Sequence, residues 1–546
     1  MRNKSLKLAL AASAVLTLAA CSASPGGGAG GGEGPAAPSY EVTANTPAPT
    51  GELDKLTWST YAEPFSLDYV YAFDYADNQI LSNVCESLVR LNDDMSISPG
   101  LATKYENPTP KTWVYTIREG VKFHDGTTLT ADDVVASMNR HLDPKIGSFW
   151  FSVYQNVESI KKTGPNEVTV TSKVPDALFN ESMSGAAGVI ASAATMAKLG
   201  AEYGNAKGGV NCTGPFELKK WQSGEKLSLT RFEGYWDKDL KAKAKELDFV
   251  VMTDPVARVN AMKSGEVDGG WLVPTNAVKE LDASGAGQVH FGMNTAVQSL
   301  VVSNPDGPLG KPEVRKALLM AIDRNGLVQA AASGYAKRTN SLTTESVWNH
   351  ADPATKEAAF KDLEDYPYDV EAAAKIIKEQ GVEGQEITIT TAPISNDFAV
   401  ISQATAAAAE SIGLKAKINT VTPNAYTALF SDPEARKGTD LYYTSWYLSV
   451  ADPQEMFSIL RTDDFSNYGS WSNPEFDKSV NKAIQTMDQD QRFTESLTAQ
   501  KITNAEIPWL PLYESPNLLW MNNKITGASP SINFMYYPWA AKIGAK

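Results

Sequence analysis

The side chains that could perform chemistry do not gather into a catalytic or metal-binding pattern in this sequence. Two adjacent carboxylate pairs, Asp132-Asp133 and Asp463-Asp464, are candidates for acid–base work. The first pair opens a predicted helix, where the helix dipole favours negative charge, so its placement has a structural explanation. The four histidines lie in unrelated segments without a second ligand at zinc-binding spacing: His124, His141, His290 and His350.

Motifs for nucleophilic, metal-dependent and phosphate chemistry are absent from the sequence. It contains no HExxH, CxxC, GxSxG or GxxxxGK[ST] segment, and GPLGK at 307–311 lacks the phosphate-loop spacing. We therefore expect no catalytic residue, no metal and no cofactor. A hydrolase stays a remote alternative, which turnover of a peptide by the purified protein would support.

Aromatic side chains are abundant and cluster in polar loops. The chain has 12 Trp and 21 Tyr. Flat rings with one polar end suit a cleft that grips a flexible ligand at low cost in side-chain entropy. For any single ring, ordinary core packing is the competing interpretation. Three segments stand out, namely YVYAFDY at 69–75, FWF at 149–151 and YYTSWY at 442–447.

Strand and helix patterns alternate along the chain, which predicts an α/β protein. An alternating segment predicts a strand over 112–118. Thr130 with Asp133 resembles a capping box, which predicts a helix over 131–141. Another helix is predicted from Pro312, with Asn325-Gly326 as its end.

Farther along, the segments 387–389, 397–412 and 415–421 predict a strand, a helix and a strand. Such a βαβ unit implies a parallel sheet in a second lobe.

Two segments are predicted to cross between lobes. The chain passes from an apolar strand to the helix at Pro312 through residues 304–310, where we place the first crossing, and the Pro-punctuated segment 506–513 is placed as the return. Two lobes on a hinge can close over a ligand and bury most of its surface. The expected division is a discontinuous first lobe, 53–303 plus 508–546, and a second lobe, 304–507.

The N-terminus carries an export signal. A basic start and an uncharged apolar run predict a signal peptide over 1–20, and the LAAC segment that ends at Cys21 resembles the lipobox of bacterial lipoproteins. Residues 21–52 are rich in Gly, Ala, Pro and Ser, which predicts a flexible linker behind a lipidated Cys21. The chain is therefore expected on the extracytoplasmic face of the cell membrane, anchored by its N-terminal lipid.

The net charge bears on the binding partners of the protein, and the cysteine content bears on its disulfide bonds. The formal net charge of −15 argues against a surface that binds nucleic acid. Besides Cys21, the chain has Cys85 and Cys212. A disulfide between them is one possibility in an exported protein, and two buried free thiols are the other.

Five segments, in this order, resemble the oligopeptide and dipeptide class of family 5 extracellular solute-binding proteins of ABC importers. They are NVCESLVRL at 83–91, SISPGLA at 96–102, TWVYTIREGVKFHDGTTLTADDV at 112–134, CTGPFEL at 212–218 and PEVRKALLMAIDR at 312–324. The resemblance implies a type II periplasmic-binding-protein-like fold with an extra subdomain at about 92–208 in the first lobe. It also implies a ligand enclosed without chemistry and delivered to ABC permease subunits. We expect a monomer that captures oligopeptides, with an oligosaccharide, an opine-like compound or a metal chelate as the alternative ligand.

The resemblance also suggests residues that bind the ligand. In peptide binders of the family, a Trp stands three positions before an Asp that pairs with the peptide's amino group; here Trp446 matches the Trp, and Ser449 occupies the Asp position. Asp452 matches the acidic residue of the acidic-Pro pair that follows. Either another acid, such as Asp74 or Asp452, takes the role, or the ligand lacks a bound free amine. The remaining candidates come from matching or analogous loops: Phe73, Tyr75, Trp150, Trp271 and Tyr443.

Overall fold

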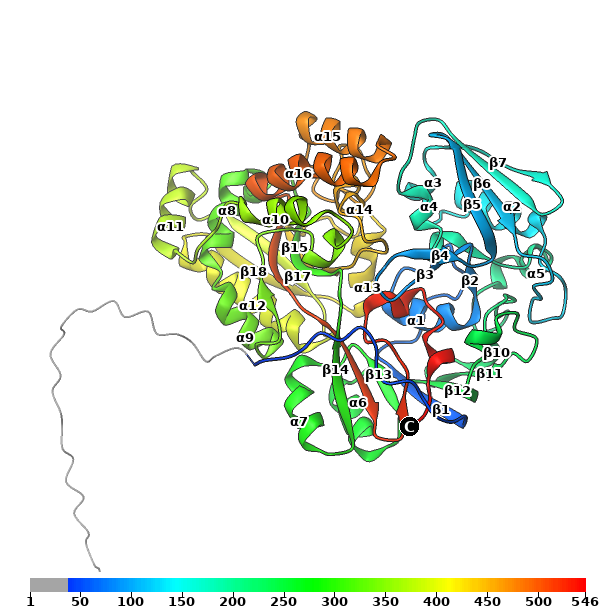
Figure 1. The fold of residues 1–546 in the computed structure, drawn as a ribbon. Coiled ribbons are helices and arrows are strands. Elements are labelled where there is room, and N and C mark those ends of the chain that lie inside the picture. Colours follow the sequence, from blue (N-terminus) through cyan, green and yellow to red (C-terminus); the bar gives the residue numbers. More distant parts are fainter. Residues whose placement is uncertain (1–37) are drawn as a thin grey trace, which may run out of the picture. The chain divides into compact units, whose positions relative to one another are not determined.

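Two large mixed sheets organise the part of the chain that the structure describes, residues 38–546 without the side chain of Asn424 (Figure 1). In this computed structural model, a seven-stranded sheet forms the core of the first lobe. Its strands in spatial order are β10 (Phe216–Gln222), β11 (Lys226–Arg231), β12 (Ala244–Val251), β1 (Leu53–Thr60), β13 (Gly269–Trp271), β21 (Asn517–Asn522) and β14 (Gly287–Gly292). The predicted signal peptide 1–20, Cys21 and the linker up to residue 37 lie outside the described residues.

The first sheet is packed on both faces. Its strand β1 pairs in parallel with β12 and β13, and Trp58 of β1 is completely buried. A Cβ on Gly269 of β13 would lie 2.3 Å from the Trp58 ring, so only glycine fits there. Helix α1 (Tyr75–Val84) contributes to the same hydrophobic cluster as Trp58, whereas α6 (Pro255–Ser264) and α7 (Val278–Ala283) contribute to a separate cluster with β14 and β21.

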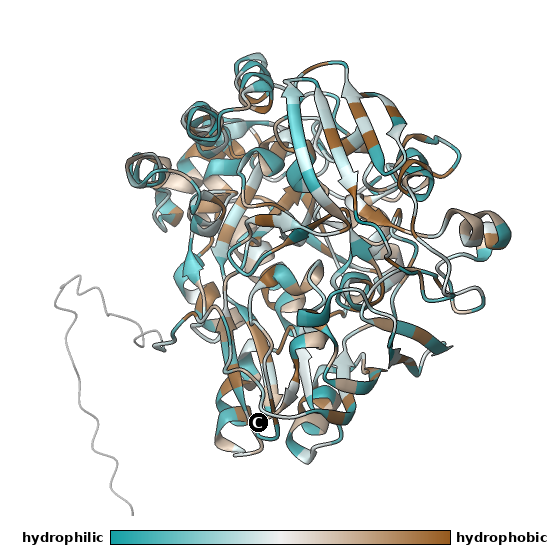
Figure 2. Cartoon of the chain, turned by 45° about the vertical axis from the view of Figure 1, so that its right-hand side comes forward, coloured by the Kyte–Doolittle hydropathy of each residue, from teal (hydrophilic) through white to brown (hydrophobic). Residues whose placement is uncertain are grey.

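The second lobe is built on a six-stranded sheet. Its strands in spatial order are β16 (Lys337–Arg338), β20 (Trp509–Glu514), β15 (Val297–Val302), β19 (Leu441–Trp446), β17 (Glu386–Thr391) and β18 (Lys415–Thr420). One hydrophobic cluster contains α8 (Pro312–Ala321), α9 (Arg324–Ala332), α11 (Val370–Glu379) and α12 (Asn396–Ser411), and another contains α10 (Pro353–Lys361), α15 (Pro474–Gln485) and α16 (Gln489–Glu506). Strands β17 and β18 pair in parallel on either side of α12 in the chain, as the βαβ pattern predicts. In Figure 2, helices at the periphery of the molecule carry many hydrophilic residues, drawn in teal.

The crossings between the lobes differ from the sequence prediction. Strand β15 was expected in the first lobe and β20 in the return segment, but each pairs within the second sheet. All six residues of β15 are buried, which suits a strand with a neighbour on both sides, and a register shift opposite β20 accommodates Pro511. The boundaries 303/304 and 507/508 are therefore wrong, and the two connections are 293–296 and 515–516.

A four-stranded antiparallel sheet forms the subdomain inserted in the first lobe. Its spatial order is β5 (Ala102–Thr109), β6 (Thr112–Ile117), β8 (Glu167–Ser172) and β7 (Val157–Gly164). Helix α2 (Ala131–Asn139) carries the capping box predicted from Thr130 and Asp133. The shorter helices and strands are β2 (Glu86–Ser87), β3 (Val89–Leu91), β4 (Ile97–Pro99), α3 (Phe151–Tyr154), α4 (Phe179–Ser182), β9 (Val189–Ile190), α5 (Ala193–Leu199), α13 (Pro423–Thr427), α14 (Gln454–Ser458), β22 (Ile525–Thr526) and β23 (Gly544–Ala545).

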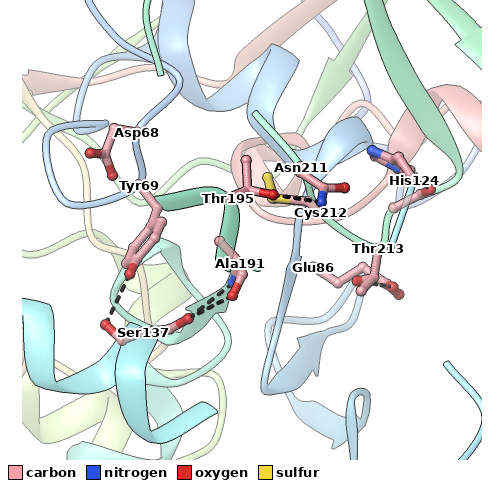
Figure 3. Close-up of a disulfide and its surroundings, with 12 residues drawn as sticks. Asp68, Tyr69, Glu86, His124, Ser137, Ala191, Thr195, Asn211, Cys212 and Thr213 are labelled. Atoms are coloured by element: carbon pink, nitrogen blue, oxygen red, sulfur yellow. Dashed lines mark hydrogen bonds between the residues drawn. A yellow bond between two sulfur atoms is a disulfide. The ribbon is translucent and has the colours of Figure 1, made fainter. Parts of the chain in front are cut away.

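A disulfide joins the two ends of this insertion (Figure 3). It links Cys85, which caps the C-terminus of α1, to Cys212, which precedes β10, with the two Cα atoms 4.8 Å apart. The buried carboxylate of Glu86 beside it accepts hydrogen bonds from Thr213 at 2.8 Å and from Tyr235 at 2.9 Å. Burial raises the pKa of Glu86, and these donors oppose that rise.

Two helices occupy the segment where the sequence pattern predicts one. Helix α8 ends at Ala321, and Asp323 caps a second helix, α9, by accepting a hydrogen bond from the main-chain nitrogen of Gly326 at 2.9 Å. The Asn325-Gly326 pair therefore lies in the first turn of α9 and does not end a helix, because Asp323 restarts it. The fully buried Arg324 fixes α9 to the second lobe by donating to the carbonyls of Thr339 at 2.6 Å and Tyr366 at 2.7 Å.

Part of the predicted linker is attached to the body. Thr43 donates its main-chain N–H to Phe291 at 2.8 Å, and the Thr46 hydroxyl donates to the carbonyl of Ala528 at 2.7 Å. The prediction of a flexible linker is therefore wrong for residues 38–52, because main-chain hydrogen bonds can hold a segment that is poor in apolar side chains. None of the helices within residues 38–546 is both long and apolar enough to cross a membrane.

Candidate functional site

The two lobes touch through the loop that follows β19. Tyr447 donates its hydroxyl to the main-chain carbonyl of Phe73 at 2.7 Å and shares a 2.9 Å hydrogen bond with the hydroxyl of Tyr536. Ala451 packs into the hydrophobic cluster of the first lobe. Residues 447–453 are therefore second-lobe chain seated against the first lobe, and we call them the contact loop.

Asp74 and Tyr75 lie at the start of α1, on the first-lobe side of this contact. The Tyr75 ring meets the Tyr447 ring edge-on, with centroids 5.1 Å apart, and its hydroxyl donates to the Ser445 carbonyl at 3.4 Å. Asp74 caps α1, accepting from the Tyr75 nitrogen at 2.7 Å and from the Tyr61 hydroxyl at 2.6 Å. Its carboxylate is thus already engaged by groups of the first lobe.

Phe73 and Trp150 belong to one aromatic group of the first lobe. Phe73 stacks on Phe149 with centroids 4.3 Å apart, and Phe149 meets Trp150 edge-on at 5.4 Å. Trp150 donates its indole N–H to the carbonyl of Ala72 at 3.2 Å. The structure therefore brings together two of the aromatic segments that the sequence singles out, 69–75 and 149–151.

Trp271 and Tyr443 lie inside the cores of separate lobes. Trp271 is 3% exposed and stacks on Phe534 with centroids 4.3 Å apart. Tyr443 is 3% exposed and donates its hydroxyl to Gln298 at 2.7 Å and to Asp397 at 2.9 Å. Both rings have a packing role in the structure.

Trp446 belongs to an aromatic group of the second lobe. It is partly buried and meets Trp509 at 5.4 Å, Tyr468 at 6.3 Å and Phe430 at 6.5 Å between ring centroids. Because side chains alternate along a strand, Trp446 and Tyr443 project from opposite faces of β19. Trp446 directly precedes the contact loop, so it remains close to the lobe interface.

Ser449 is hydrogen-bonded to a carboxylate. Its hydroxyl donates to Oε1 of Glu455 at 2.6 Å, and the main-chain nitrogen of Val450 donates to Oε2 at 2.9 Å. Glu455 lies in α14, which folds back over the contact loop. The chain therefore places an acid against the residue where the family resemblance led us to expect an Asp.

Asp452 is neutralised within the protein. It forms a 2.7 Å ion pair with Arg492, and both side chains are almost fully buried. Arg492 also reaches Glu181 of the first lobe at 3.4 Å, so it links the lobes. Within residues 38–546, no Lys, Arg or His forms an ion pair with Glu455.

The surroundings of Glu455 disfavour its charged form. Burial raises its pKa to about 7, the charge of Asp452 adds to the rise, and the hydrogen bonds from Ser449 and Val450 oppose it. Burial also raises the pKa of Tyr536, and the nearby Glu455 charge contributes to that rise. A cation placed beside Glu455 would reverse this balance and favour the carboxylate.

Three residues of this interface were not among the sequence candidates. Tyr447 ends the aromatic segment 442–447, so its type was noted but not its role. Glu455 stands only three residues after Asp452. Helix α14 folds back and brings it to Ser449, and the spacing of these residues in the sequence does not predict that contact. Tyr536 comes from the C-terminal segment, and nothing in its local sequence indicates this contact.

The titratable groups of residues 38–546 show no metal site. No group of three or more His, Cys, Asp or Glu side chains in that range is placed to hold a metal ion. The geometry instead offers aromatic rings, tyrosine hydroxyls and the carboxylate of Glu455, which forms no ion pair with a cationic side chain of the described residues. Such groups can bind a ligand but do not form a catalytic constellation.

Comparisons with known proteins agree with this architecture. A family model described as bacterial extracellular solute-binding proteins, family 5, middle, matches residues 96–468. The glutathione-binding protein GsiB of Escherichia coli (strain K12) is 24% identical over 470 residues, which cover 85% of this chain and 89% of that protein.

Solved structures show the same fold. The periplasmic binding protein DppA from Helicobacter pylori, in complex with the peptide STSA, aligns with a TM-score of 0.81 at 20% identity, covering 91% of this chain and 98% of that one. AgaA from A. tumefaciens R10, in complex with agropinic acid, aligns with a TM-score of 0.79 at 22% identity, covering 90% and 98%. The fold is thus that of the type II periplasmic peptide-binding proteins, as the resemblance implied. Because the family model matches more than half of its length, the chain belongs to family 5 of the bacterial extracellular solute-binding proteins, the substrate receptors of ABC importers.

Proposed function

We propose that this receptor captures a peptide or peptide-like ligand that carries a free amine, and that Glu455 binds the amine between the lobes. The observation that carries the proposal is a partly buried carboxylate at the lobe interface, held by Ser449 and Val450 and without a cationic partner in residues 38–546. An acid in such surroundings is destabilised unless a cation accompanies it. A ligand ammonium supplies that cation.

The neighbouring charges support Glu455 over the other acids. Asp452 already has Arg492, and Asp74 already caps α1. Arg492 is also shared with Glu181, so it is not available to Glu455. Glu455 therefore replaces the two carboxylates that the sequence suggested for this role.

Aromatic rings are proposed to form the walls of the site. Phe73, Tyr75 and Trp150 would contribute from the first lobe and Trp446 from the second, with Ser449 orienting the acid. Tyr447 and Tyr536 join this set because their hydroxyls meet at the interface. We assign Trp271, Tyr443, Asp74 and Asp452 to the framework that supports these walls, since their contacts are internal.

The cellular setting follows from the N-terminal sequence. We propose that residues 1–20 are removed, that Cys21 carries a lipid, and that the monomeric receptor works on the outer face of the cell membrane beside ABC permease subunits. The small-residue composition before Pro38 suits a tether of this kind. Mass determination of the membrane-extracted protein tests this, because an unmodified Cys21 would contradict it.

A second candidate ligand is an opine-like compound. It is favoured by the agropinic acid bound in AgaA, together with Ser449 at the position where peptide binders have an acid. A ligand without a free amine would gain nothing from Glu455. The charge state of that acid therefore separates the two candidates.

Mass spectrometry of ligand released from the purified mature protein tests the proposal. We expect peptides or amino-acid conjugates with a free amine, and calorimetry with the synthetic compounds should reproduce binding. Exclusive recovery of sugars or of amine-free compounds would contradict the proposed ligand class while leaving the receptor role intact.

The hydroxyl of Tyr447 gives a test of lobe closure. Replacing Tyr447 by Phe keeps the ring but removes the hydrogen bonds to Phe73 and Tyr536. Each such bond contributes about 1 kcal/mol, so we expect the loss of both to weaken binding of the identified ligand about 30-fold by calorimetry. Tyr368→Phe, at a ring that is 58% exposed, is the matched control. Equal affinities of the two variants would show that this contact does not support the bound state.

A further inference from the structure

The first described residues lie across the hinge between the lobes. We call residues 38–43 the N-terminal strap. The strap begins on the second lobe, where Pro38 packs against Gly334: a Cβ on Gly334 would lie 2.5 Å from Cδ of Pro38. Gly334 has φ +82° and directly follows α9, so its backbone conformation and this contact both favour glycine.

The strap ends on the first lobe. Thr43 donates its main-chain N–H to Phe291 of β14 at 2.8 Å, and Val42 forms a parallel bridge with the same residue. Six residues of chain therefore pass from one lobe to the other. In Figure 1 this segment, in dark blue, crosses over the connections between the lobes.

Tyr40 is the residue that contacts both lobes. Its ring stacks on Phe291 of the first lobe with centroids 4.9 Å apart and lies 6.1 Å from the ring of Tyr335 of the second. The rings of Phe291 and Tyr335 are themselves 5.3 Å apart. The three rings form one group that spans the lobes, and Tyr335 belongs to a hydrophobic cluster otherwise made of first-lobe residues.

This aromatic group lies next to both interlobe connections. Phe291 is the penultimate residue of β14, immediately before the connection 293–296. Burial raises the pKa of Tyr40, the charge of Glu514 raises it further and Lys337 opposes the rise. Glu514 precedes the other connection, 515–516. A change in the hinge angle must therefore alter the surroundings of Tyr40.

We infer that the N-terminal strap is a clasp on the hinge: it seats on both lobes in this structure, where the lobes touch through the contact loop, and thereby favours closure. Opening the lobes separates the partners of Tyr40, and the stacking of its ring opposes that separation. Aromatic pairs of this kind contribute free energy beyond that of the area they bury.

The strap directly follows the segment proposed as the membrane tether. The tether would therefore attach at the hinge itself, so a pull on it would act on the conformation of the receptor.

Single-molecule fluorescence transfer between the lobes tests this without any ligand. Dyes are attached at cysteines introduced for Lys161 in β7 and Lys375 in α11, both exposed, whereas the native Cys85 and Cys212 are bonded and buried. Tyr40→Ala is expected to lower the ratio of closed to open molecules about three- to tenfold. Tyr40→Phe, which keeps the ring, should restore the ratio, and Ser39→Ala is the matched control at an exposed position of the strap.

A second variant guards against a folding defect. Tyr335→Ala removes the second-lobe partner, and its effect should not add to that of Tyr40→Ala, since both changes remove the same contact. Circular dichroism and thermal unfolding would show that each variant is folded. Equal ratios for Tyr40→Ala and Ser39→Ala, or a protein that is open with or without Tyr40, would overturn the inference whatever the ligand proves to be.

Discussion

Replacing Glu455 by glutamine is expected to weaken binding of the amine-bearing ligand about 100-fold. The change keeps the shape of the side chain and its hydrogen bond from Ser449, but it removes the charge that faces the ligand ammonium. Loss of one partner from a buried, hydrogen-bonded charge pair costs about 2–5 kcal/mol, which corresponds to the expected factor. Isothermal calorimetry with the co-purified ligand measures it.

A control variant distinguishes the loss of the Glu455 carboxylate from a general change in the net charge of the protein. Glu475→Gln removes an acid in the exposed first turn of α15, away from the contact loop, and should leave the affinity unchanged. Glu455→Gln should leave the unliganded protein folded, since it removes an acid disfavoured by burial while its amide oxygen keeps one of the two acceptor positions used by Ser449 and Val450. An affinity within threefold of the parent would eliminate Glu455 as the group that binds the amine.

The pH dependence of binding should have the same origin. With a pKa of about 7, Glu455 is ionised in about a tenth of the unliganded molecules at pH 6 and in about nine tenths at pH 8. Affinity for an amine that stays protonated should therefore rise about tenfold over that range, and Glu455→Gln should abolish the rise. The contribution of Glu455 to stability changes with pH in the opposite direction. Its pKa in the folded protein lies above the ordinary value of 4.5, so its contribution to the free energy of unfolding falls as the pH rises from about 4.5 to 7.

Removing the disulfide should cause the largest loss of stability. The bond between Cys85 and Cys212 joins residues 127 apart in sequence, and closing a loop of that length restricts the unfolded chain by about 4–5 kcal/mol. The double variant Cys85→Ala/Cys212→Ala should lose about that much in the free energy of unfolding of the first lobe. Denaturant unfolding followed by tryptophan fluorescence measures the loss.

The reduced parent protein provides the comparison for this prediction. With a reductant present, its unfolding midpoint should approach that of the double variant, whereas the midpoint of the variant should not respond to the reductant. A parent midpoint that is the same with and without reductant would show that the bond contributes nothing to folding. The ligand site lies elsewhere, so affinity measured well below the midpoint should be kept.

Local sequence patterns predicted the individual elements better than their pairing. The capping box at Thr130 and the βαβ unit around α12 were read correctly because the patterns that define them are local. The lobe boundaries were misplaced because β15 and β20 are apolar segments whose sheet is decided by strands far away in the chain. The second helix at Asp323 was missed because Asn325-Gly326 is a common stop signal, and only the cap shows that a new helix begins.

The site was predictable in outline but not in its chemistry. The aromatic segment 69–75 was singled out from type and clustering, and its residues Phe73 and Tyr75 contact Tyr447 of the contact loop. Trp446, which the family resemblance suggested, directly precedes that loop. Ser449 was recognised as a departure from the family pattern. The compensation that we propose for it, through Glu455, depends on the fold-back of α14, a three-dimensional relation that a single sequence does not display.

The placement of β21 affects the order in which the chain can fold. The second lobe, 297–514, is continuous in sequence, so it can form as soon as that stretch is available. The first lobe cannot, because β21 inserts between β13 and β14, and the two strands have no partner on that side until residues 517–522 arrive. Nearly the whole chain must therefore be available before β21 can complete this sheet. The first lobe is thus expected to fold slowly, because its contacts join residues far apart in the sequence. If the signal peptide proposed above exports the chain, this delay leaves the first lobe unfinished until the chain has crossed the membrane.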